Sequence, residues 1–360
     1  MTSKINTYKR FTNLFLVLFC LFIGFSSQLM ANAGQPTAVA DAPIDITAIA
    51  LEHVGDAHSW HLWSEGNDAV AVPLPVIIYS STKGLQVFSS SRFEHGHASY
   101  NGYKLEDEKI ISEDVTESFY DVSITKNVAQ MLFSAIILFL IFISIAKSYK
   151  TQGVTTAPKG KQSFFEPLIM FVRDDIAKGN IGHGSEKFVP YLLTVFFMIL
   201  INNVFGMIPI GANLTGNIAF TLVLSVATMI VTNINGNKNY WSHIFLPHAP
   251  KAIWPILIPI EIVGILTKPF ALMMRLFANM TAGHIIIISL VGLIFVFKTI
   301  YIAPVSVAFA LFIDVLECLV AFLQAYVFTM LTALFIGSAV ADHNGDGAHD
   351  SDDKALEAKH

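Results

Sequence analysis

The second half of the chain consists mainly of long apolar segments. The longest covers residues 256–297 and, as one helix rising about 1.5 Å per residue, would be about 60 Å long. The hydrocarbon core of a bilayer is only about 30 Å thick, and no cluster of turn-forming residues divides the segment. The pattern therefore predicts one continuous, strongly tilted helix, with Pro269 as the position of any bend.

Four further apolar segments predict four more membrane-spanning helices. The last of them is also too long for an upright span, so we expect a second tilted helix. The two middle segments are joined by a short uncharged connection and predict a hairpin, in which Asn202 and Asn203 are expected to bond between helices rather than to serve transport. The four segments are residues 128–146, 188–208, 218–234 and 305–340.

The N-terminal part has a different pattern. Three basic residues within the first ten precede the apolar stretch 14–25, and Ala31-Asn32-Ala33 offers a small-residue cleavage site, so residues 1–33 are predicted to be a signal peptide. An uncleaved anchor helix is the alternative. Residues 34–125 are polar and mixed, with short apolar pieces near 72–79 that suggest strands. They form the predicted extracytoplasmic extension.

The predicted fold class is therefore an all-α integral membrane protein with five transmembrane passes, two of them long, strongly tilted helices. A small extracytoplasmic segment precedes the membrane domain, which covers residues 126–340. Between residues 147 and 161, four lysines follow the first span and mark the cytoplasmic side. Later in the same loop, residues 164–176 mix aromatic and charged side chains and predict a helix at the membrane surface.

This orientation predicts a multi-pass protein of a bacterial inner membrane. The extension then lies in the periplasm, and five passes leave the acidic tail at residues 341–360 in the cytoplasm.

Composition agrees with the membrane assignment. Hydrophobic residues make up 54% of the 360 residues and charged residues 14%, with a mean hydropathy of +0.58, which excludes an ordinary soluble fold. The net charge of -5 argues against nucleic-acid binding. Cys20 and Cys318 lie inside apolar segments, and the histidines of the extension lack a ligand spacing, so we expect no disulfide framework, metal site or cofactor.

Charged side chains inside the long apolar helix need a separate explanation. Arg275 is the only formally charged residue between Pro269 and Lys298. An arginine at mid-membrane depth costs roughly 2.5–3.5 kcal/mol on insertion scales and normally faces a cavity or a partner. Asn279 lies one turn further on the same face, whereas His284 lies on the opposite side.

The last apolar segment carries Asp314, Glu317 and Gln324. Glu317 and Gln324 are two turns apart and share a helix face, and Asp314 lies near it. Histidine has an ordinary pKa near 6.5 and burial raises the pKa of carboxylates, so both groups can relay protons. Arginine keeps its proton and acts as a fixed charge. Together these residues indicate a proton relay with an electrostatic gate.

Each of these residues also has a structural alternative. Arg275 could extend its guanidinium to the interface, His284 could be a packing histidine, and Asp314 could face water. Glu261 and Lys268 share a face and could form an ion pair rather than act in transport.

Several motifs of the chain resemble those of a known family, subunit a of F-type ATP synthases. The resemblance covers residues 125–340 and rests on Lys268-Pro269, on Arg275-Leu-Phe-Ala-Asn279-Met-Thr-Ala-Gly283 and on Gln324-Ala-Tyr-Val-Phe328. Asn203-Val-Phe-Gly-Met-Ile-Pro209 and Lys187-Phe188-Val-Pro190 support it. The family's fold places such a subunit in the stator, beside a rotating ring of c subunits.

The resemblance implies roles for matching positions. Arg275 corresponds to the arginine that faces the c-ring carboxylate and separates two aqueous half-channels, with Gln324 and Asn279 beside it. His284 and Glu317 stand where some bacterial members have the two residue types exchanged. Glu261 matches an acidic position in the family.

Asp314 has no counterpart in the common pattern of the family. The implied partners are the c-ring, the b subunits of the peripheral stalk, the rest of the ATP synthase complex, the lipid bilayer and protons. The subunit would catalyse nothing alone, and it has no P-loop motif, so ATP would be made on other chains.

Two other classes of protein remain as alternatives. A secondary transporter with intramembrane coupling charges predicts internal repeats, and none pairs the two halves of this sequence. A passive membrane anchor has no use for Arg275. The sequence leaves open whether protons or sodium ions are carried.

Overall fold

The structure of the protein is a computed structural model. It describes residues 55–63, 70–96, 98–106, 109–114, 118–152, 160–182, 184–208, 211–246, 250, 253–297 and 301–341. The predicted signal peptide, residues 34–54 of the predicted extension, and nearly all of the predicted tail lie outside the described residues.

Four described helices are long and apolar enough to cross a membrane. They are α3 (Lys126–Gln152), α6 (Val189–Met207), α9 (Trp254–Phe297) and α10 (Ala303–Val340). The shorter α7 (Ile218–Ile234) meets α8 (Lys238–Phe245) at 102°, and this bent pair makes a fifth span if it is taken as one unit. The structure thus confirms a mostly helical membrane protein with four to five candidate spans.

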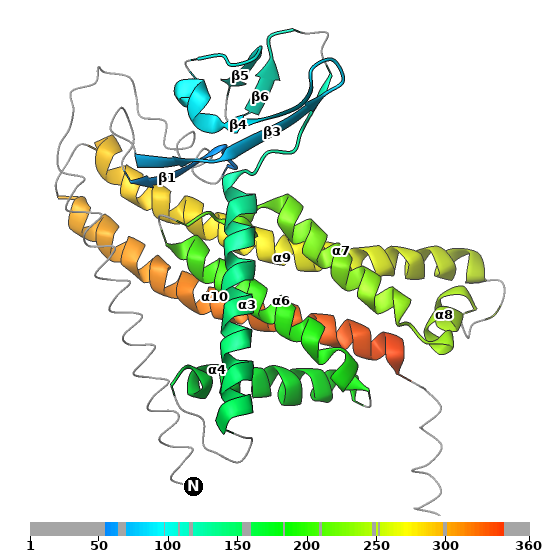
Figure 1. The fold of residues 1–360 in the computed structure, drawn as a ribbon. Helices are drawn as coiled ribbons and strands as arrows, with labels where there is room; N and C mark the ends of the chain where they lie inside the picture. The colour runs from blue at the N-terminus through cyan, green and yellow to red at the C-terminus, as the bar shows by residue number, and fades with distance from the viewer. Residues whose placement is uncertain are drawn as a thin grey trace, which may run out of the picture.

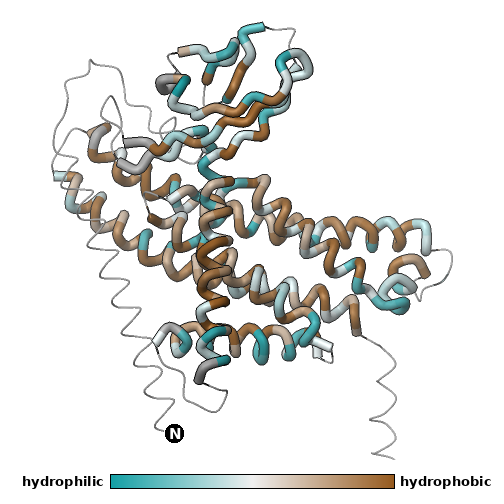
Figure 2. Tube along the Cα trace, in the orientation of Figure 1, coloured by the Kyte–Doolittle hydropathy of each residue, from teal (hydrophilic) through white to brown (hydrophobic). Residues whose placement is uncertain are grey.

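Each of the two longest apolar segments forms one uninterrupted helix. α9 has 44 residues although Pro259 and Pro269 lie inside it, and α10 has 38 residues. Unpaired backbone groups are costly in hydrocarbon, so a long apolar segment remains helical even across a proline. Figure 1 shows α9 and α10 side by side, crossing α3 steeply instead of running along it. Figure 2 shows hydrophobic residues over most of these helices.

The core of the membrane domain lies where α6, α9 and α10 meet. Its fully buried side chains come from all three helices and interlock as in other close-packed interiors. They include Leu192 and Phe197 of α6, Leu272 and Leu276 of α9, and Phe328 and Ile336 of α10.

Two buried asparagines of α6 hydrogen-bond to neighbouring helices. The side-chain nitrogen of Asn203 donates to the carbonyl oxygen of Ala321 in α10, 3.0 Å away. The hydroxyl of Ser134 in α3 donates to the amide oxygen of Asn202 at 2.7 Å. Such bonds join helices in an apolar environment. The predicted structural role of both asparagines is confirmed.

Below α3, the chain runs sideways through α4 (Lys161–Met170) and the π-helical η2 (Phe171–Lys178), followed by α5 (Gly179–Ile181). Figure 2 shows polar residues along this part, and Figure 1 shows it crossing the lower end of α3. Val172 and Ile176 are buried against the core, whereas Asp174 pairs with Arg173 and Lys178 on the outer side. The helix predicted at 164–176 is confirmed, and its place at the membrane surface stays a prediction.

Gly337 allows α10 to approach α5 closely. A Cβ atom at this position would overlap the carbonyl oxygen of Asn180. Because neither backbone can move freely, Gly337→Ala is expected to destabilise the subunit by about 1–3 kcal/mol, which is typical of overpacking. Thermal unfolding of the protein in detergent measures this loss.

Gly264→Ala in α9 is the matched control for that measurement, since a Cβ there meets nothing within 4 Å. Equal thermal stability of the two variants would contradict a tight α5–α10 contact.

The described residues between 55 and 125 form a small, mainly β structure. The strands are β1 (Ser59–Trp63), β2 (Val70–Pro73), β3 (Pro75–Ser80), β4 (Gly84–Ser89), β5 (Tyr103–Glu106), β6 (Lys109–Ser112) and β7 (Phe119–Asp121), with a 3-10 helix η1 (Ser90–Gly96). They pair as β1–β2, β4–β3–β7 and β5–β6, all antiparallel. The all-α prediction therefore applies to the membrane domain only, and the strands suggested near residues 72–79 are confirmed.

The extension has its own core, made by Val76, Ile78, Phe93, Tyr103 and Ile110. At its edge, Nε2 of the buried His58 lies 3.2 Å from Oδ2 of Asp121. Partial burial raises the pKa of Asp121, but hydrogen bonds from His58 and Ser123 outweigh it, so the pKa falls below its usual value. This contact stabilises the folded extension above the ordinary pKa of aspartate, near 3.9.

Candidate functional site

An acid and an imidazole meet between the two longest helices. Nδ1 of His284 in α9 lies 3.1 Å from Oε1 of Glu317 in α10, and both side chains are largely buried, with 14% and 5% of their surface exposed. Both residues are predicted from sequence to lie on a proton path. The structure brings them into direct contact across the α9–α10 interface, which the spacing within each helix did not reveal.

A second polar pair lies in the same interface. Nδ2 of Asn279 donates to Oε1 of Gln324 at 2.9 Å, and the Gln324 side chain is buried. Nε2 of Gln324 has no hydrogen-bond partner among the described residues. An unpaired buried donor is costly, so this group is suited to a water molecule or to an acceptor from outside the chain.

Arg275 lies one turn before Asn279 on α9. It is exposed, while Leu272, Leu276 and Met280 on the adjoining face of the helix are buried. Within the described part of the chain, Arg275 forms no ion pair and no hydrogen bond. The chain therefore presents this fixed charge on its outer surface.

Asp314 lies one turn before Glu317 on α10 and is half-buried. No ion pair or hydrogen bond joins it to the other described residues, whereas Glu317 is bonded to His284. The structure therefore places Asp314 beside the acid–imidazole pair but not in contact with it. Its function remains a prediction.

Glu261 and Lys268 contact different partners. Oε1 of Glu261 lies 4.0 Å from Nδ1 of His243 in α8, and Nζ of Lys268 lies 5.4 Å from the centre of the Phe335 ring. No ion pair between Glu261 and Lys268 exists in the described structure, so the predicted alternative of a structural pair is not supported.

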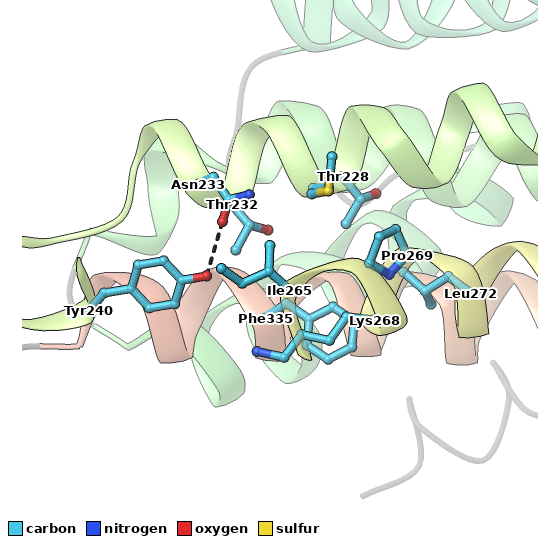
Figure 3. A pocket seen from close by; sticks show the side chains of 10 residues that line it. Thr228, Thr232, Asn233, Tyr240, Ile265, Lys268, Pro269, Leu272 and Phe335 are labelled. Carbon is cyan, nitrogen blue, oxygen red and sulfur yellow. Dashed lines mark hydrogen bonds between the residues drawn. The ribbon is translucent and has the colours of Figure 1, made fainter. Parts of the chain in front are cut away.

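A small cavity opens between α7, α9 and α10, and Lys268 is one of the residues that line it. Figure 3 shows its walls, which include Thr232, Ile265, Lys268 and Phe335. The hydroxyl of Tyr240 closes one end by donating to Oδ1 of Asn233 at 3.0 Å. The ammonium group of Lys268 extends along the cavity toward Tyr240. The walls thus combine apolar side chains with hydroxyls and one cation.

Gly283 sets the position of the Glu317 carboxylate. A Cβ atom at residue 283 would lie 2.8 Å from Oε1 and 2.9 Å from Cδ of Glu317. The Gly283→Ala methyl is therefore expected to push the carboxylate away from His284 and, along the predicted proton path, to slow proton transport at least about tenfold, equivalent to about 1.4 kcal/mol. Proton uptake by vesicles that carry the intact complex measures the rate.

Gly264→Ala again serves as the control for that variant, because it adds the same methyl to the same helix without contacting Glu317. A Gly283→Ala complex that transports at the control rate would show that the position of the carboxylate is not critical. Gly283 was recognised from sequence only as part of a motif. A glycine directly before His284 was the sequence signal that another side chain approaches this position closely.

Among the described residues, no group of three or more His, Cys, Asp or Glu side chains is arranged so that it could hold a metal ion. The polar groups of the α9–α10 interface are instead a histidine, a carboxylate and two amides. These groups can exchange or orient protons without a metal ion.

Comparison with known proteins gives two family matches. The family described as ATP synthase A chain matches residues 128–337, which is most of the membrane domain. A family described as a domain of unknown function (DUF8433) matches residues 49–131, the part that contains the β structure.

Three curated relatives support the first match. "ATP synthase subunit a" of Chloroherpeton thalassium is 53% identical over 235 residues, which cover 64% of this chain and 71% of the relative. "ATP synthase subunit a 2" of Chlorobaculum tepidum is 51% identical over 64% of this chain and 67% of the relative. "ATP synthase subunit a" of Anaeromyxobacter sp. is 42% identical over 71% of this chain and 62% of the relative. The chain therefore belongs to the ATP synthase A chain family, as its intramembrane motifs predicted.

Proposed function

We propose that this chain, as the proton-translocating a subunit of an F-type ATP synthase, forms two proton half-channels against a ring of c subunits and couples proton flow to rotation. One observation carries the proposal. Arg275 is exposed on α9 without a partner among the described residues, and the same helix carries the imidazole of a buried acid–imidazole pair nine residues further on. A stator that works against a rotor needs such an outward-facing charge, whereas a passive anchor does not.

The first half-channel would use His284 and Glu317. A proton that reaches the imidazole can pass to the carboxylate over the 3.1 Å between Nδ1 and Oε1, leaving a neutral acid. Asp314, one turn away, offers a second acceptor near the same path. From Glu317 the proton would continue to a carboxylate of the ring that has turned away from Arg275.

Arg275 would hold an ionised ring carboxylate opposite α9 until that carboxylate is protonated. Because the guanidinium does not release its proton, it cannot relay protons and blocks a direct leak between the half-channels. The amide of Asn279 fixes Gln324, and the free Nε2 of Gln324 is available to a ring carboxylate or water near Arg275.

The second half-channel would begin at the cavity between α7, α9 and α10. Glu261 and His243 lie beside it, and Lys268 lines it. A cation here disfavours a second positive charge, so a proton released by the ring would be passed on to Glu261 rather than retained.

The orientation follows from the lysines after α3, which mark the cytoplasmic side. Five passes, with α9 and α10 strongly tilted, put the extension in the periplasm and the C-terminus in the cytoplasm of a bacterial inner membrane. The c-ring and the b subunits of the peripheral stalk are the proposed neighbours, and ATP chemistry takes place on other chains of the complex. Alone, the subunit is not an enzyme.

Vesicles that contain the complex with or without this chain test the function. ATP-driven acidification is expected only with the chain, and a protonophore should abolish it. Sodium-dependent uptake that survives the protonophore would identify sodium as the carried ion. Uptake of an organic solute without any need for the ring would instead support the secondary transporter.

A further inference from the structure

The sheet β4–β3–β7 has one covered and one bare face. Its covered face supplies Val76 and Ile78 to the core of the extension. Besides Pro75 and Ser89, the opposite face, here called the bare sheet face, carries six large apolar or aromatic residues, none of them charged. Five are strongly exposed, by 53% to 73%, and Ile77 is intermediate. The six residues are Ile77, Tyr79, Leu85, Val87, Tyr120 and Val122.

Strand pairing makes these residues one continuous patch. Tyr79 stands opposite Leu85 in β4 and opposite Tyr120 in β7, and Ile77 stands opposite Val87. The backbone nitrogen of Val122 donates to the carbonyl oxygen of Ile77 at 2.9 Å. An antiparallel sheet with one face in water normally turns polar residues outward. A contiguous apolar patch instead marks a contact with a membrane or another molecule.

The sheet is fixed to the end of α3, a candidate membrane span. The backbone nitrogen of Ile124 donates to the carbonyl of Pro75 in β3 at 3.1 Å. At the first turn of the helix, the backbone nitrogen of Lys126 donates to the carbonyl of Ala57, and that of Asn127 donates to Oδ1 of Asp56. These bonds leave the sheet little freedom to move relative to α3.

The bare sheet face is turned toward the side of the molecule where the helices lie. Figure 1 shows β5 and β6 on the far side of β3 and β4 from the helices, and the covered face packs toward β5 and β6. Further along α3, the helix to which the sheet is bonded, Leu132, Phe133 and Ile136 are exposed. These apolar side chains lie on a candidate membrane span, so the sheet is held at the end of a helix with a lipid-facing surface.

We propose that the bare sheet face rests on the lipid bilayer, with Tyr79 and Tyr120 at the level of the headgroups. Tyrosine is enriched at membrane interfaces because its ring is apolar and its hydroxyl can remain in water. Lipid is the occupant that the structure favours, because the sheet is bonded to the end of a candidate membrane span and its uncharged face is turned toward the helices. The inference concerns the extension alone and does not depend on proton transport.

Spin labels in the assembled complex test this contact. Val87→Cys and Lys104→Cys are each labelled in a background without the native cysteines, and the complex is placed in lipid nanodiscs. Lys104 is the control, since it lies on β5 and its side chain is 43% exposed. Relaxation by lipid-soluble oxygen should exceed relaxation by a water-soluble nickel complex at residue 87, and the order should reverse at residue 104.

Two results would overturn the proposal. A label at residue 87 that is as open to the nickel complex as the control shows a face in water. A label protected from both reagents shows a face covered by another protein. Unchanged ATP-driven proton uptake confirms that each labelled complex is folded.

Discussion

Replacing Arg275 with alanine is expected to abolish ATP-driven proton uptake and ATP synthesis while the complex stays assembled. The guanidinium is exposed on α9 and has no partner among the described residues, so its removal leaves no unpaired charge inside the chain. Both rates should fall at least about 100-fold, which corresponds to about 2.7 kcal/mol in activation free energy. Acidification of vesicles and ATP synthesis under an imposed gradient measure it.

Arg173→Ala is the matched control, since this arginine lies on η2 with 42% of its side chain exposed and forms its ion pair with its neighbour Asp174 at 2.9 Å. It should leave both rates close to those of the unaltered complex. ATP synthesis at a near-normal rate in an assembled Arg275→Ala complex would contradict the gate and indicate a structural role for Arg275. A complex that no longer pumps but lets protons through freely would instead strengthen the assignment as a gate.

Breaking the acid–imidazole pair should be nearly as severe, and exchanging its members should restore part of the activity. His284→Glu leaves two carboxylates facing each other, and Glu317→His leaves two imidazoles, so each single variant is expected to lose at least about tenfold in proton uptake. The double variant recreates one acid and one imidazole between α9 and α10. It should recover a substantial part of the rate.

The exchange separates a relay from a packing contact. Glu106→Gln, in an exposed pair with Lys104 of the extension, is the control for loss of a carboxylate and should have no effect. A double variant that is slower than both single variants would contradict a relay that needs only the two residue types. Rates measured between pH 5 and 8 add a second reading, because histidine changes charge in that range.

The long helices could be predicted from sequence because their signal is strong and local. An apolar segment of more than twenty residues has few alternatives in a bilayer, so the predicted segment at residues 256–297 differs from α9 by only two residues at its start. The polar residues on α9 and α10 were identified for the same reason, since each interrupts an apolar pattern.

Contacts between elements could not be predicted in the same way. The bond between His284 and Glu317 depends on the register of two helices, and no spacing within one helix determines that register. α8 lies in a connection that mixes polar and aromatic residues, and its eight residues give too short a pattern to be recognised. The strand order of the extension likewise depends on pairing between distant segments.

The close contact between Gly337 of α10 and the backbone of α5 has a mechanical consequence. If a ring of c subunits turns against this chain, each force on the ring is accompanied by an equal and opposite lateral force on α9 and α10. α10 is braced against α6 where Asn203 bonds to Ala321, against α5 at Gly337, and against the start of α8 where the backbone nitrogen of Asn237 donates to Ala339. A helix supported near its middle and its end bends little under torque, so less of each step is lost as elastic work in the stator.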